Sequence, residues 1–363
     1  MWKRVLIYFL PALPLFLLGW IAWAILFLRS PLKTKPLGEW NKGELSNPYA
    51  TSKKKRWIKA AIHLHTNRAW FTPLRNSPEE VMEVYANHGY ELLSFTDYEK
   101  ITRIPSGKIA GLSGYEWGRN FRKRHMTVLG AREVDHDMFP LYSSPENIQW
   151  EIDLQNKKGN FVTINHPSLY DSFPLPFLEK LSGYNAIEVL SPFGDILEYW
   201  DRLLSLGVSS FCMASDDLHY LPKEEYLKVT KDSFPSLREF ATKMSDQDGE
   251  SLMRYVLINS DSLEEKDVLS SLKSGNYACV RKMDRVLADP KLKIFGIRNG
   301  KEVYYEFEDL PLTVDFIGKN GKLLSRSYGQ KKGSYRFQPG DLYVRIQIVF
   351  PTAVVLSNPF YQK

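Results

Sequence analysis

Hydrophobic and polar positions alternate in a recurring way from about residue 56 to residue 280. Apolar runs of strand length are separated there by segments in which apolar residues recur at helical spacing. The expected strands are 57–65, 91–97, 109–117, 125–131, 160–167, 185–190, 208–217 and 254–259. The expected helices, each ending in Gly, are 77–89, 144–159, 196–207 and 262–275. This alternation predicts a parallel α/β architecture, either a barrel or a doubly wound sheet.

The pattern changes after about residue 280, where alternating or continuous β runs succeed one another without a segment of helical period. Turns are expected at Asn299-Gly300, Asn320-Gly321 and Pro339-Gly340. We therefore predict that residues 285–363 form a small all-β sandwich, appended to an α/β domain of residues 56–284.

The N-terminus carries an uncharged apolar run, residues 5–28. As a helix it would be long enough to cross a hydrocarbon core of about 30 Å. A cleavable signal peptide is the alternative, with Ala22-Trp23-Ala24 as its cleavage site, but the apolar run continues to Leu28. We expect a single transmembrane anchor within residues 1–28 and a polar linker over 29–55.

The side of the membrane is left open by the flanking charges. Lys3 and Arg4 precede the apolar run, and more basic residues come after it, which by strict count would leave the body in the cytoplasm. A short basic N-terminus before an apolar run is instead typical of a signal-anchor that exports the rest of the chain. On that ground we place the body outside the cytoplasm as an expectation.

Composition changes this picture little. Of the 363 residues, 44% are hydrophobic and 25% charged, as in globular proteins with a sizeable core. The net charge of +6 is concentrated in basic runs at 53–59 and 119–124, which are typical of solvated faces. Neither run has the arrangement of a nucleic-acid-binding module, so we expect no nucleic-acid partner. Cys212 and Cys279 lie in apolar runs and indicate neither a disulfide framework nor a zinc site.

The segment 61–73 contains His63 and His65, two apart in an expected strand, so both imidazoles can face one point. A single H-x-H is a weak signal for metal, because half-exposed strands produce many such pairs. Further histidines and acids fall at strand ends, where ligands of parallel α/β folds bind. These residues are Glu116, His125, His166, Asp217 and His219.

Six short motifs occur in order along the chain: H-L-H-T, S-F-T-D-Y, G-Y-E, H-M-T-V-L-G, N-H-P and D-D-L-H. This ordered set resembles the PHP (polymerase and histidinol phosphatase) superfamily, whose usual pattern is H-x-H-[ST], T-D-H, G-x-E, H-x-x-x-G, H-P and D-x-H. The match covers about residues 56–280, and the run SLKSGNYACV and the closing LSNPFY are similar to members with a C-terminal β-sandwich. The resemblance implies a distorted (β/α)7 barrel that binds two or three divalent metals and hydrolyses phosphate esters.

The resemblance also implies a ligand set. The first metal would be held by His63, His65, Glu116 and Asp217, and Glu116 would bridge to a second metal held by His125 and His166. Mixed imidazole and carboxylate ligands suit Mn, Zn or Fe, and a bridging carboxylate suits a metal pair that activates water. We therefore expect two divalent metal ions as cofactors, with no side-chain nucleophile.

The sequence departs from the family pattern at the third metal site. Tyr98 stands where members with three metals have the His of T-D-H, and residues 67–71 offer neither His nor Asp. His219 is then a candidate general acid or substrate contact, and whether a third metal binds is open. Asp97 is a catalytic candidate or a cap at a strand end. Arg68, with Tyr98, is a candidate for binding a phosphate or a sugar, with plain packing as the alternative.

Four further residues rank lower. Asp216 competes with Asp217 for the ligand role, which the D-x-H spacing gives to Asp217. Glu188 is expected to support a ligand rather than to be one. His88, at a helix end, and His136, in a loop, are expected to be structural.

The leading hypothesis is a membrane-anchored, metal-dependent phosphoesterase with a phosphorylated or otherwise hydrolysable small-molecule substrate. An amide or carbamate hydrolase is the second hypothesis, because dinuclear sites also cleave those bonds. The third is a degenerate barrel that serves as a glycan- or protein-binding module.

Overall fold

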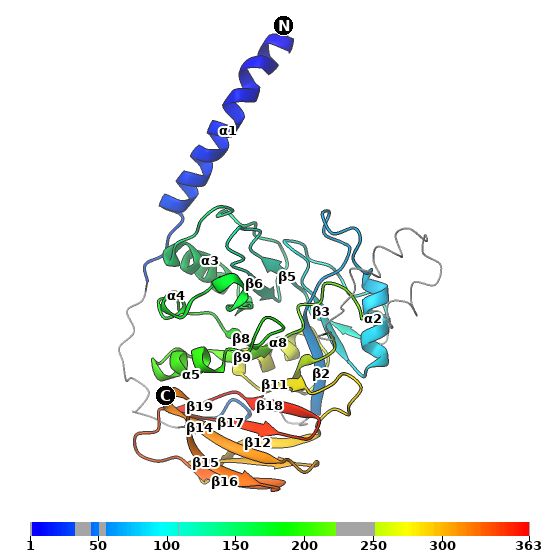
Figure 1. Ribbon diagram of the computed structural model, residues 1–363, viewed down its shortest axis with the longest axis vertical. Helices are drawn as coiled ribbons and strands as arrows, with labels where there is room; N and C mark the ends of the chain where they lie inside the picture. The colour runs from blue at the N-terminus through cyan, green and yellow to red at the C-terminus, as the bar shows by residue number, and fades with distance from the viewer. Residues whose placement is uncertain (1, 33–44, 51–55, 108, 223–250, 363) are drawn as a thin grey trace.

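The computed structural model describes residues 2–32, 45–50, 56–107, 109–222 and 251–362, with side chains of the first helix described from Pro14 onward. Most of the predicted linker, and the basic residues 53–55, lie outside the described residues. Helix α1 (Trp2–Phe27) projects from the body of the protein (Figure 1). In the part of the chain that is described, no helix is long and apolar enough to cross a membrane. The expected transmembrane helix within residues 5–28 thus has no support from the structure.

The region from residue 56 to residue 284 is a mixed α/β fold that agrees with the predicted alternation. Its strands are β2 (Arg56–Leu64), β3 (Leu92–Phe95), β4 (Ala110–Gly111), β5 (Gly114–Trp117), β6 (Met126–Leu129), β7 (Phe161–Ile164), β8 (Ala186–Leu190), β9 (Phe211–Ala214), β10 (Arg254–Ser260) and β11 (Tyr277–Lys282). Its helices are α2 (Pro78–Asn87), α3 (Pro145–Lys157), α4 (Leu175–Leu178), α5 (Leu197–Ser205) and α8 (Glu265–Ser274), with a 3₁₀ turn η2 (Leu169–Asp171).

Helix α2 begins where the sequence predicts. The Ser77 hydroxyl accepts a hydrogen bond from the backbone N–H of Glu80, and the Glu80 carboxylate accepts one from the backbone N–H of Ser77. This reciprocal pair satisfies two N–H groups that a helix start leaves free. Helix α3 begins in the same way with Ser144 and Asn147.

The sheet topology departs from a purely parallel arrangement. In the five-stranded sheet β5-β6-β7-β8-β9, strand β6 is antiparallel to both β5 and β7, and only β7, β8 and β9 run parallel. The connection between β5 and β6 contains no crossover helix, and a strand that returns without a crossover must be antiparallel to its predecessor. In the largest sheet β2, β3 and β4 are parallel, whereas β10 is antiparallel to β2. The prediction of parallel strands was wrong for β6 and β10, whereas β5 runs in the same direction as β7.

Two isolated β-bridges connect these sheets near His63, His65 and Glu116. Leu64, at the end of β2, pairs with Leu218, and Tyr98, which comes after β3, pairs with Glu116 in β5. The ends of β2, β3, β5 and β9 are thereby held next to one another.

The C-terminal region is almost entirely strand. It contains β12 (Leu292–Arg298), β13 (Glu302–Phe307), β14 (Thr313–Gly318), β15 (Lys322–Tyr328), β16 (Lys332–Arg336), β17 (Tyr343–Val349), β18 (Ala353–Ser357) and β19 (Phe360–Gln362), with a 3₁₀ turn η3 (Lys319–Gly321). The sheet β12-β13-β16 packs on strands of the largest sheet through aromatic rings, such as Tyr305 on Phe316 and Phe307 on Phe350. Strand β18 pairs with β11, and the short strand β1 (Leu45–Ser46) pairs with β19, so backbone hydrogen bonding continues across residue 284.

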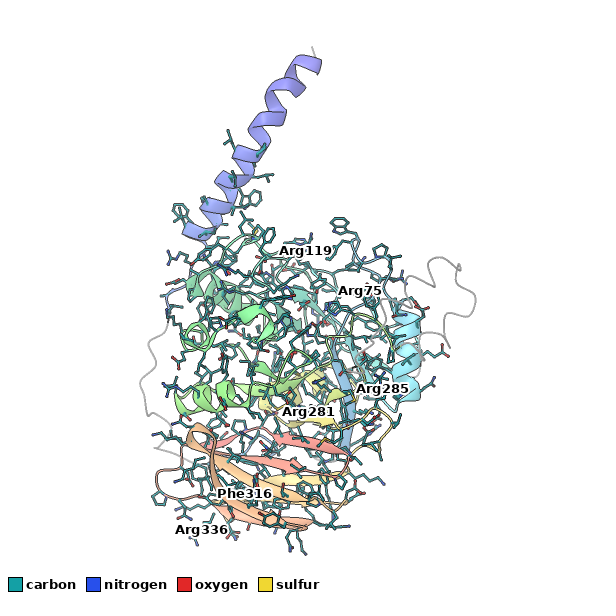
Figure 2. All side chains as sticks on the ribbon, in the orientation of Figure 1. Arg75, Arg119, Arg281, Arg285, Phe316 and Arg336 are labelled. Atoms are coloured by element: carbon teal, nitrogen blue, oxygen red, sulfur yellow. A yellow bond between two sulfur atoms is a disulfide. The ribbon has the colours of Figure 1, made fainter. Side chains whose placement is uncertain are left out.

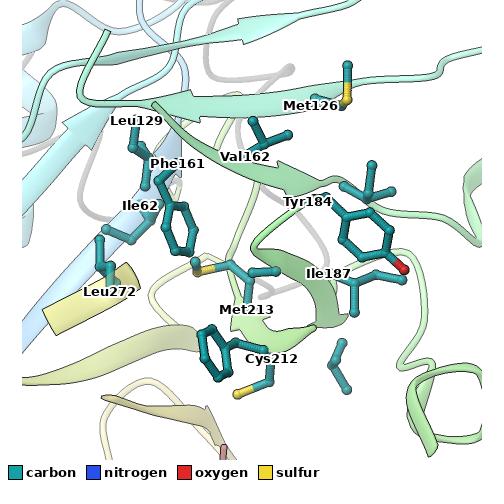
Figure 3. Packing of buried hydrophobic residues seen from close by; sticks show 14 of the residues in the cluster. Ile62, Met126, Leu129, Phe161, Val162, Tyr184, Ile187, Cys212, Met213 and Leu272 are labelled. Atoms are coloured by element: carbon teal, nitrogen blue, oxygen red, sulfur yellow. The ribbon is translucent and has the colours of Figure 1, made fainter. Parts of the chain in front are cut away.

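A large apolar core lies beneath the site. Figure 3 shows Ile62, Phe161 and Met213 packed together from β2, β7 and β9, all buried. The side chains of Cys212 in β9 and Cys279 in β11 form a disulfide. The expectation that the cysteines are not a disulfide pair was therefore wrong, because a separation of 67 residues gives no local sign that two strands meet.

Candidate metal centre

The end of strand β2 carries two of the predicted ligands. His63 and His65 project to the same side, with their ring centroids 5.2 Å apart, and both side chains are buried. Ile62 points the other way into the core. The backbone N–H of His65 donates to the carbonyl of Leu218 at 2.9 Å, which fixes the strand end against the segment that carries Asp217.

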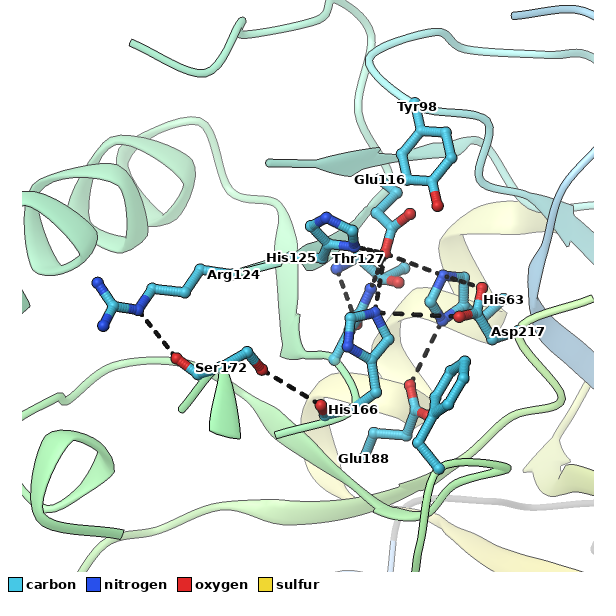
Figure 4. A network of polar contacts seen from close by, with 12 residues as sticks. His63, Tyr98, Glu116, Arg124, His125, Thr127, His166, Ser172, Glu188 and Asp217 are labelled. Atoms are coloured by element: carbon cyan, nitrogen blue, oxygen red, sulfur yellow. Dashed lines mark hydrogen bonds and ion pairs between the residues drawn. The ribbon is translucent and has the colours of Figure 1, made fainter. Parts of the chain in front are cut away.

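Two buried carboxylates face these imidazoles. His63 Nε2 lies 3.2 Å from Glu116 Oε1 and 3.2 Å from Asp217 Oδ1. His65 Nε2 lies 3.2 Å from Glu116 Oε2 and 3.0 Å from Asp217 Oδ1. Both carboxylates therefore face both imidazoles of the H-x-H pair. Figure 4 shows Glu116 and Asp217 beside His63.

A second group shares Glu116. Its Oε1 lies 3.1 Å from His125 Nδ1 and 3.4 Å from His166 Nε2. The geometry yields three compact sets of potential ligand atoms: His63 with His65 and Glu116, Glu116 with His125 and His166, and His65 with Asp217 and His219. Glu116 stands between the first two sets, in the bridging position that the sequence analysis expected for it.

Several buried atoms of the cluster lack a protein partner in the part of the chain that the structure describes. Those without a hydrogen-bond partner among the described residues are His63 Nε2, His65 Nδ1 and Nε2, Glu116 Oε2, His125 Nδ1, His166 Nδ1 and Asp217 Oδ1. Buried polar groups are normally paired, so such a concentration indicates a missing component.

The spacing of these atoms matches ligands around one ion. Two atoms that are each about 2.1 Å from a metal stand about 3.0 Å apart at a right angle and about 3.4 Å apart at a tetrahedral angle. The imidazole to carboxylate distances given above cover 3.0 to 3.4 Å. Charge-assisted hydrogen bonds between the same groups would be shorter, about 2.7–2.9 Å. The donor set therefore fits divalent metal ions.

Electrostatics of the cluster result from burial and mutual attraction. Burial alone would lower the pKa of His63, but the Asp217 and Glu116 carboxylates outweigh it and raise that pKa well above its usual value. Burial would raise the pKa of Glu116, but His125 and His63 hold it well below its usual range. The pKa of Asp217 is lowered in the same way, against burial, chiefly by His63 and His219. Both carboxylates are thus kept ionised, the state in which they can bind a cation.

Residues around the cluster orient it. The Asn165 amide donates to Glu116 Oε1 at 2.9 Å, and its carbonyl accepts the backbone N–H of Thr127 at 3.1 Å. Glu188 Oε2 lies 3.4 Å from His63 Nδ1. That contact fixes which ring nitrogen of His63 faces the cluster, the supporting role expected for Glu188. Asn165 was not predicted, although it directly precedes His166 in N-H-P.

Two candidate ligands have strained backbones. His166 has a φ of 28° and Asp217 a φ of 45°, values that residues other than Gly rarely adopt. Such conformations cost energy and concentrate at functional sites. The segment behind His166 is held by Arg124, whose Nε donates to the Ser172 carbonyl at 2.9 Å, while the Ser172 hydroxyl donates to the His166 carbonyl at 3.3 Å (Figure 4).

His219 lies at the edge of the cluster beside Tyr98. Its Nδ1–H donates to the Asp217 carbonyl at 2.7 Å, and its Nε2 lies 3.4 Å from the Tyr98 hydroxyl. Burial lowers the pKa of His219 to about 4. The roles expected for His219, general acid or substrate contact, stay predictions, and its place beside His65 and Asp217 adds that of a further ligand.

Two predicted catalytic residues have other roles. Asp97 is buried, and its carboxylate accepts hydrogen bonds from the Thr66 backbone, the Thr66 hydroxyl and the Thr102 hydroxyl at 2.5–2.6 Å. It anchors the loop after His65, as the strand-end alternative anticipated. Arg68 is exposed, and its guanidinium lies 3.5 Å from Glu79, away from the cluster. Because the turn after Thr66 directs Arg68 outward, its position lends no support to the predicted contact with a phosphate or a sugar, which stays a prediction.

Arg75 occupies the region assigned to Arg68. Its guanidinium carbon lies 5.4 Å from the centre of the Tyr98 ring, and its Nη1 is buried with no hydrogen-bond partner among the described residues. No sequence motif identified it, because it comes after an irregular turn whose path the residue pattern does not determine.

The lower-ranked residues lie outside the cluster. Asp216 accepts backbone hydrogen bonds from residues 252–254 and does not face the imidazoles, so the geometry favours Asp217. His88 bonds the Val84 carbonyl at the end of α2, and His136 is exposed beside Glu99.

Comparison with known proteins found a distant structural similarity. No protein-family model matches the chain, and no curated protein matches it. The structure is similar to the crystal structure of a two-domain protein from Bacteroides vulgatus ATCC 8482 that contains a predicted PHP-like metal-dependent phosphoesterase. The TM-score is 0.42 and the sequence identity 11%, over 92% of this chain and 91% of that chain.

Proposed function

We propose that the protein is a metal-dependent phosphoesterase of PHP type, in which two divalent ions share Glu116. The observation that carries the proposal is the meeting of four buried histidines and two buried carboxylates from distant strands, with seven of their side-chain nitrogen and oxygen atoms left without a hydrogen-bond partner among the described residues. Under this proposal, β2, β3 and β5–β9 make up the distorted (β/α)7 barrel, and the C-terminal strands its appended β-sandwich.

Each residue of the site has its own part in the reaction. His63, His65, Asp217 and Glu116 would hold one ion, and Glu116, His125 and His166 the other, with Mn, Zn or Fe as the candidates. Bound metals would supply a hydroxide from water and offset charge on a phosphoryl oxygen. Glu188 and Asn165 hold His63 and Glu116 in place, and Arg75 is positioned to bind a negatively charged oxygen of the substrate.

The unsatisfied atoms also bear on the alternatives. A degenerate barrel used only for binding would have no reason to retain a cluster in which seven buried nitrogen and oxygen atoms have no hydrogen-bond partner among the described residues, since each such atom costs stability. An amide or carbamate hydrolase would use the same ions, and Arg75 is the feature that favours an anionic phosphate over a neutral amide.

The test is hydrolysis of aryl phosphates and aryl amides by the metal-loaded protein, beside His63→Ala, Asp217→Ala and the control His88→Ala. We expect phosphate release by the parent and by His88→Ala, and none by the two cluster variants, whose circular dichroism stays that of the parent. Phosphate release that survives both cluster substitutions, or turnover of amides alone, would overturn the assignment.

We propose in addition that the body lies outside the cytoplasm. The Cys212–Cys279 disulfide supports this, since disulfides persist mainly in oxidising compartments. Thiol alkylation of the denatured protein, taken from cells before and after reduction, should label both cysteines only after reduction. Labelling without reduction would contradict the proposal. Anchoring by residues 5–28 stays a prediction, which membrane fractionation tests.

A further inference from the structure

A cavity of about 800 Å³ lies directly over the metal centre. His125 and His219 form part of its floor, and Tyr98 and Arg75 part of its wall. Its volume falls in the range of small-molecule sites and leaves ample room beyond a phosphate group. The additional space is therefore available to the rest of the substrate.

One wall of the cavity is a continuous series of rings that runs from solvent to the metal centre. Trp70 contacts Phe71 edge to face, with ring centroids 5.4 Å apart. Phe71 stacks on Tyr98 at 5.6 Å, and Tyr98 stacks on His65 at 4.5 Å. A group joined to a phosphate at the metal centre would lie along these rings.

The aromatic side chains at the mouth of the cavity are largely exposed to solvent, which is unusual for large apolar residues. Trp70 is 79% exposed, and Phe121, which also lines the cavity, is 82% exposed. Exposed apolar side chains that gather at a cavity mouth mark binding sites, whereas single ones are ordinary. The Phe121 backbone N–H donates to the carbonyl of Pro140, which also lines the cavity, at 3.0 Å, so the loop that presents this ring is held in place.

The charge of the cavity has one sign. Arg75, Arg119 and Lys123 line it, and no acidic side chain among the described residues does. The Arg119 guanidinium carbon lies 4.9 Å from the centre of the Phe71 ring and 5.9 Å from that of Trp70, in cation–π contact with both. Arg119 also lies 3.6 Å from Glu99, so it is held beside the rings. Figure 2 shows Arg75 and Arg119 at the end of the molecule from which α1 projects.

We infer that the substrate is an amphipathic phosphate ester, with its phosphate at the metal centre and an apolar group of several carbons against Trp70, Phe71 and Phe121. This inference rests on the proposed function and names the substrate class of that site. A small polar ester would leave the side chains of Trp70 and Phe121 exposed to water. A neutral amphiphile would offer no negative charge to Arg75, whose Nη1 has no hydrogen-bond partner among the described residues.

The test compares two alkyl phosphates whose leaving alcohols are alike in reactivity, hexyl and ethyl phosphate. Binding of hexyl- and ethylphosphonate, which cannot be hydrolysed, is measured by calorimetry on the same metal-loaded full chain. We expect the hexyl compound to bind about tenfold more tightly or better, since four further methylenes are removed from water. We expect kcat/KM for the two phosphates to differ in the same direction.

Variants assign the preference to the rings. Trp70→Ala and Phe121→Ala should each reduce the hexyl-to-ethyl ratio severalfold, whereas Tyr328→Ala, an exposed ring on β15 outside the cavity, should leave the ratio at the parent value. Equal binding of the two phosphonates, or a ratio that both ring variants retain, would overturn the inference.

The outcomes separate this inference from the proposed function. Hydrolysis of both phosphates without a chain-length preference would overturn the inferred substrate class and leave the proposed phosphoesterase function standing. Tight binding of hexylphosphonate without hydrolysis of either ester would overturn the proposed phosphoesterase function and support an amphipathic ligand. A third arm, phosphate release from phosphatidic acid in phosphatidylcholine vesicles, distinguishes a membrane amphiphile from a soluble one, and either source supports the substrate class.

Discussion

Two buried charged clusters in this protein look similar in composition but differ in how well they are paired. In one, Arg345 of β17 donates from Nε and Nη2 to the two oxygens of Asp201 in α5, both at 2.7 Å, and the Tyr343 hydroxyl adds a third bond at 2.8 Å. In the other, around Glu116, imidazoles and carboxylates lie 3.0–3.4 Å apart, and seven atoms lack a hydrogen-bond partner in the described part of the chain.

This difference in pairing indicates that the Asp201 cluster stabilises the fold and that the Glu116 cluster is built to bind an ion. The Asp201 cluster is complete, since a bidentate guanidinium satisfies a carboxylate, and it connects α5 to the C-terminal strands. The Glu116 cluster is spaced for a central ion and stands on a strained backbone, which only a compensating function would maintain. Burial of charge is common to the two clusters, and the pairing of their atoms is what distinguishes them.

The largest effect on activity is expected from substitution of Glu116. We expect Glu116→Gln to lower kcat/KM for a phosphate ester by about 10³-fold or more, because the shared carboxylate is lost from both ligand groups. Initial rates of phosphate release measure it. A variant that keeps a tenth of the parent rate would show that Glu116 is not the shared ligand.

Substitution in the Asp201 cluster should lower stability and leave activity unchanged. Asp201→Ala leaves Arg345 buried without its partner, and we expect the free energy of unfolding to fall by about 3–5 kcal/mol. Denaturant titration measures it. The rate per folded molecule should stay that of the parent, and a loss of activity without a loss of stability would contradict the division between the clusters.

A smaller effect is expected at the residue that orients His63. Glu188→Gln removes a carboxylate 3.4 Å from His63 Nδ1, and we expect metal affinity to fall about 10- to 100-fold. Competition with a chromophoric chelator measures affinity, with Glu179→Gln, on the surface, as the control. Unchanged affinity would leave Glu188 with a packing role only.

The mildest prediction concerns a buried carboxyl outside both clusters. Burial raises the pKa of Glu151 to about 8, from an ordinary value of about 4.5. Its contribution to stability is then fully present below the ordinary value and is lost as the pH rises through about 8. Glu151→Gln should flatten the fall in stability over that interval. Thermal melts at about pH 5 and about pH 8 test this, and identical pH profiles for variant and parent would refute it.

Much of this organisation could be predicted from the sequence, because it depends on local signals. Ser77 and Ser144 start their helices as expected, and the ordered motifs identified every member of the Glu116 cluster. The features that could not be predicted depend on long-range closure or on irregular turns. The antiparallel direction of β6 and the Cys212–Cys279 pair are examples of the first. The position of Arg75, rather than Arg68, beside Tyr98 is an example of an irregular turn that the sequence does not determine.

The most direct test of the central claim is the metal content of the purified full chain by elemental mass spectrometry, after metal loading and removal of free ions. His63→Ala, His166→Ala and the control His88→Ala are measured beside it. We expect about two equivalents per chain in the parent and in the control, and a lower content in both cluster variants. Little or no metal in the parent, or an equal content in all four proteins, would contradict it.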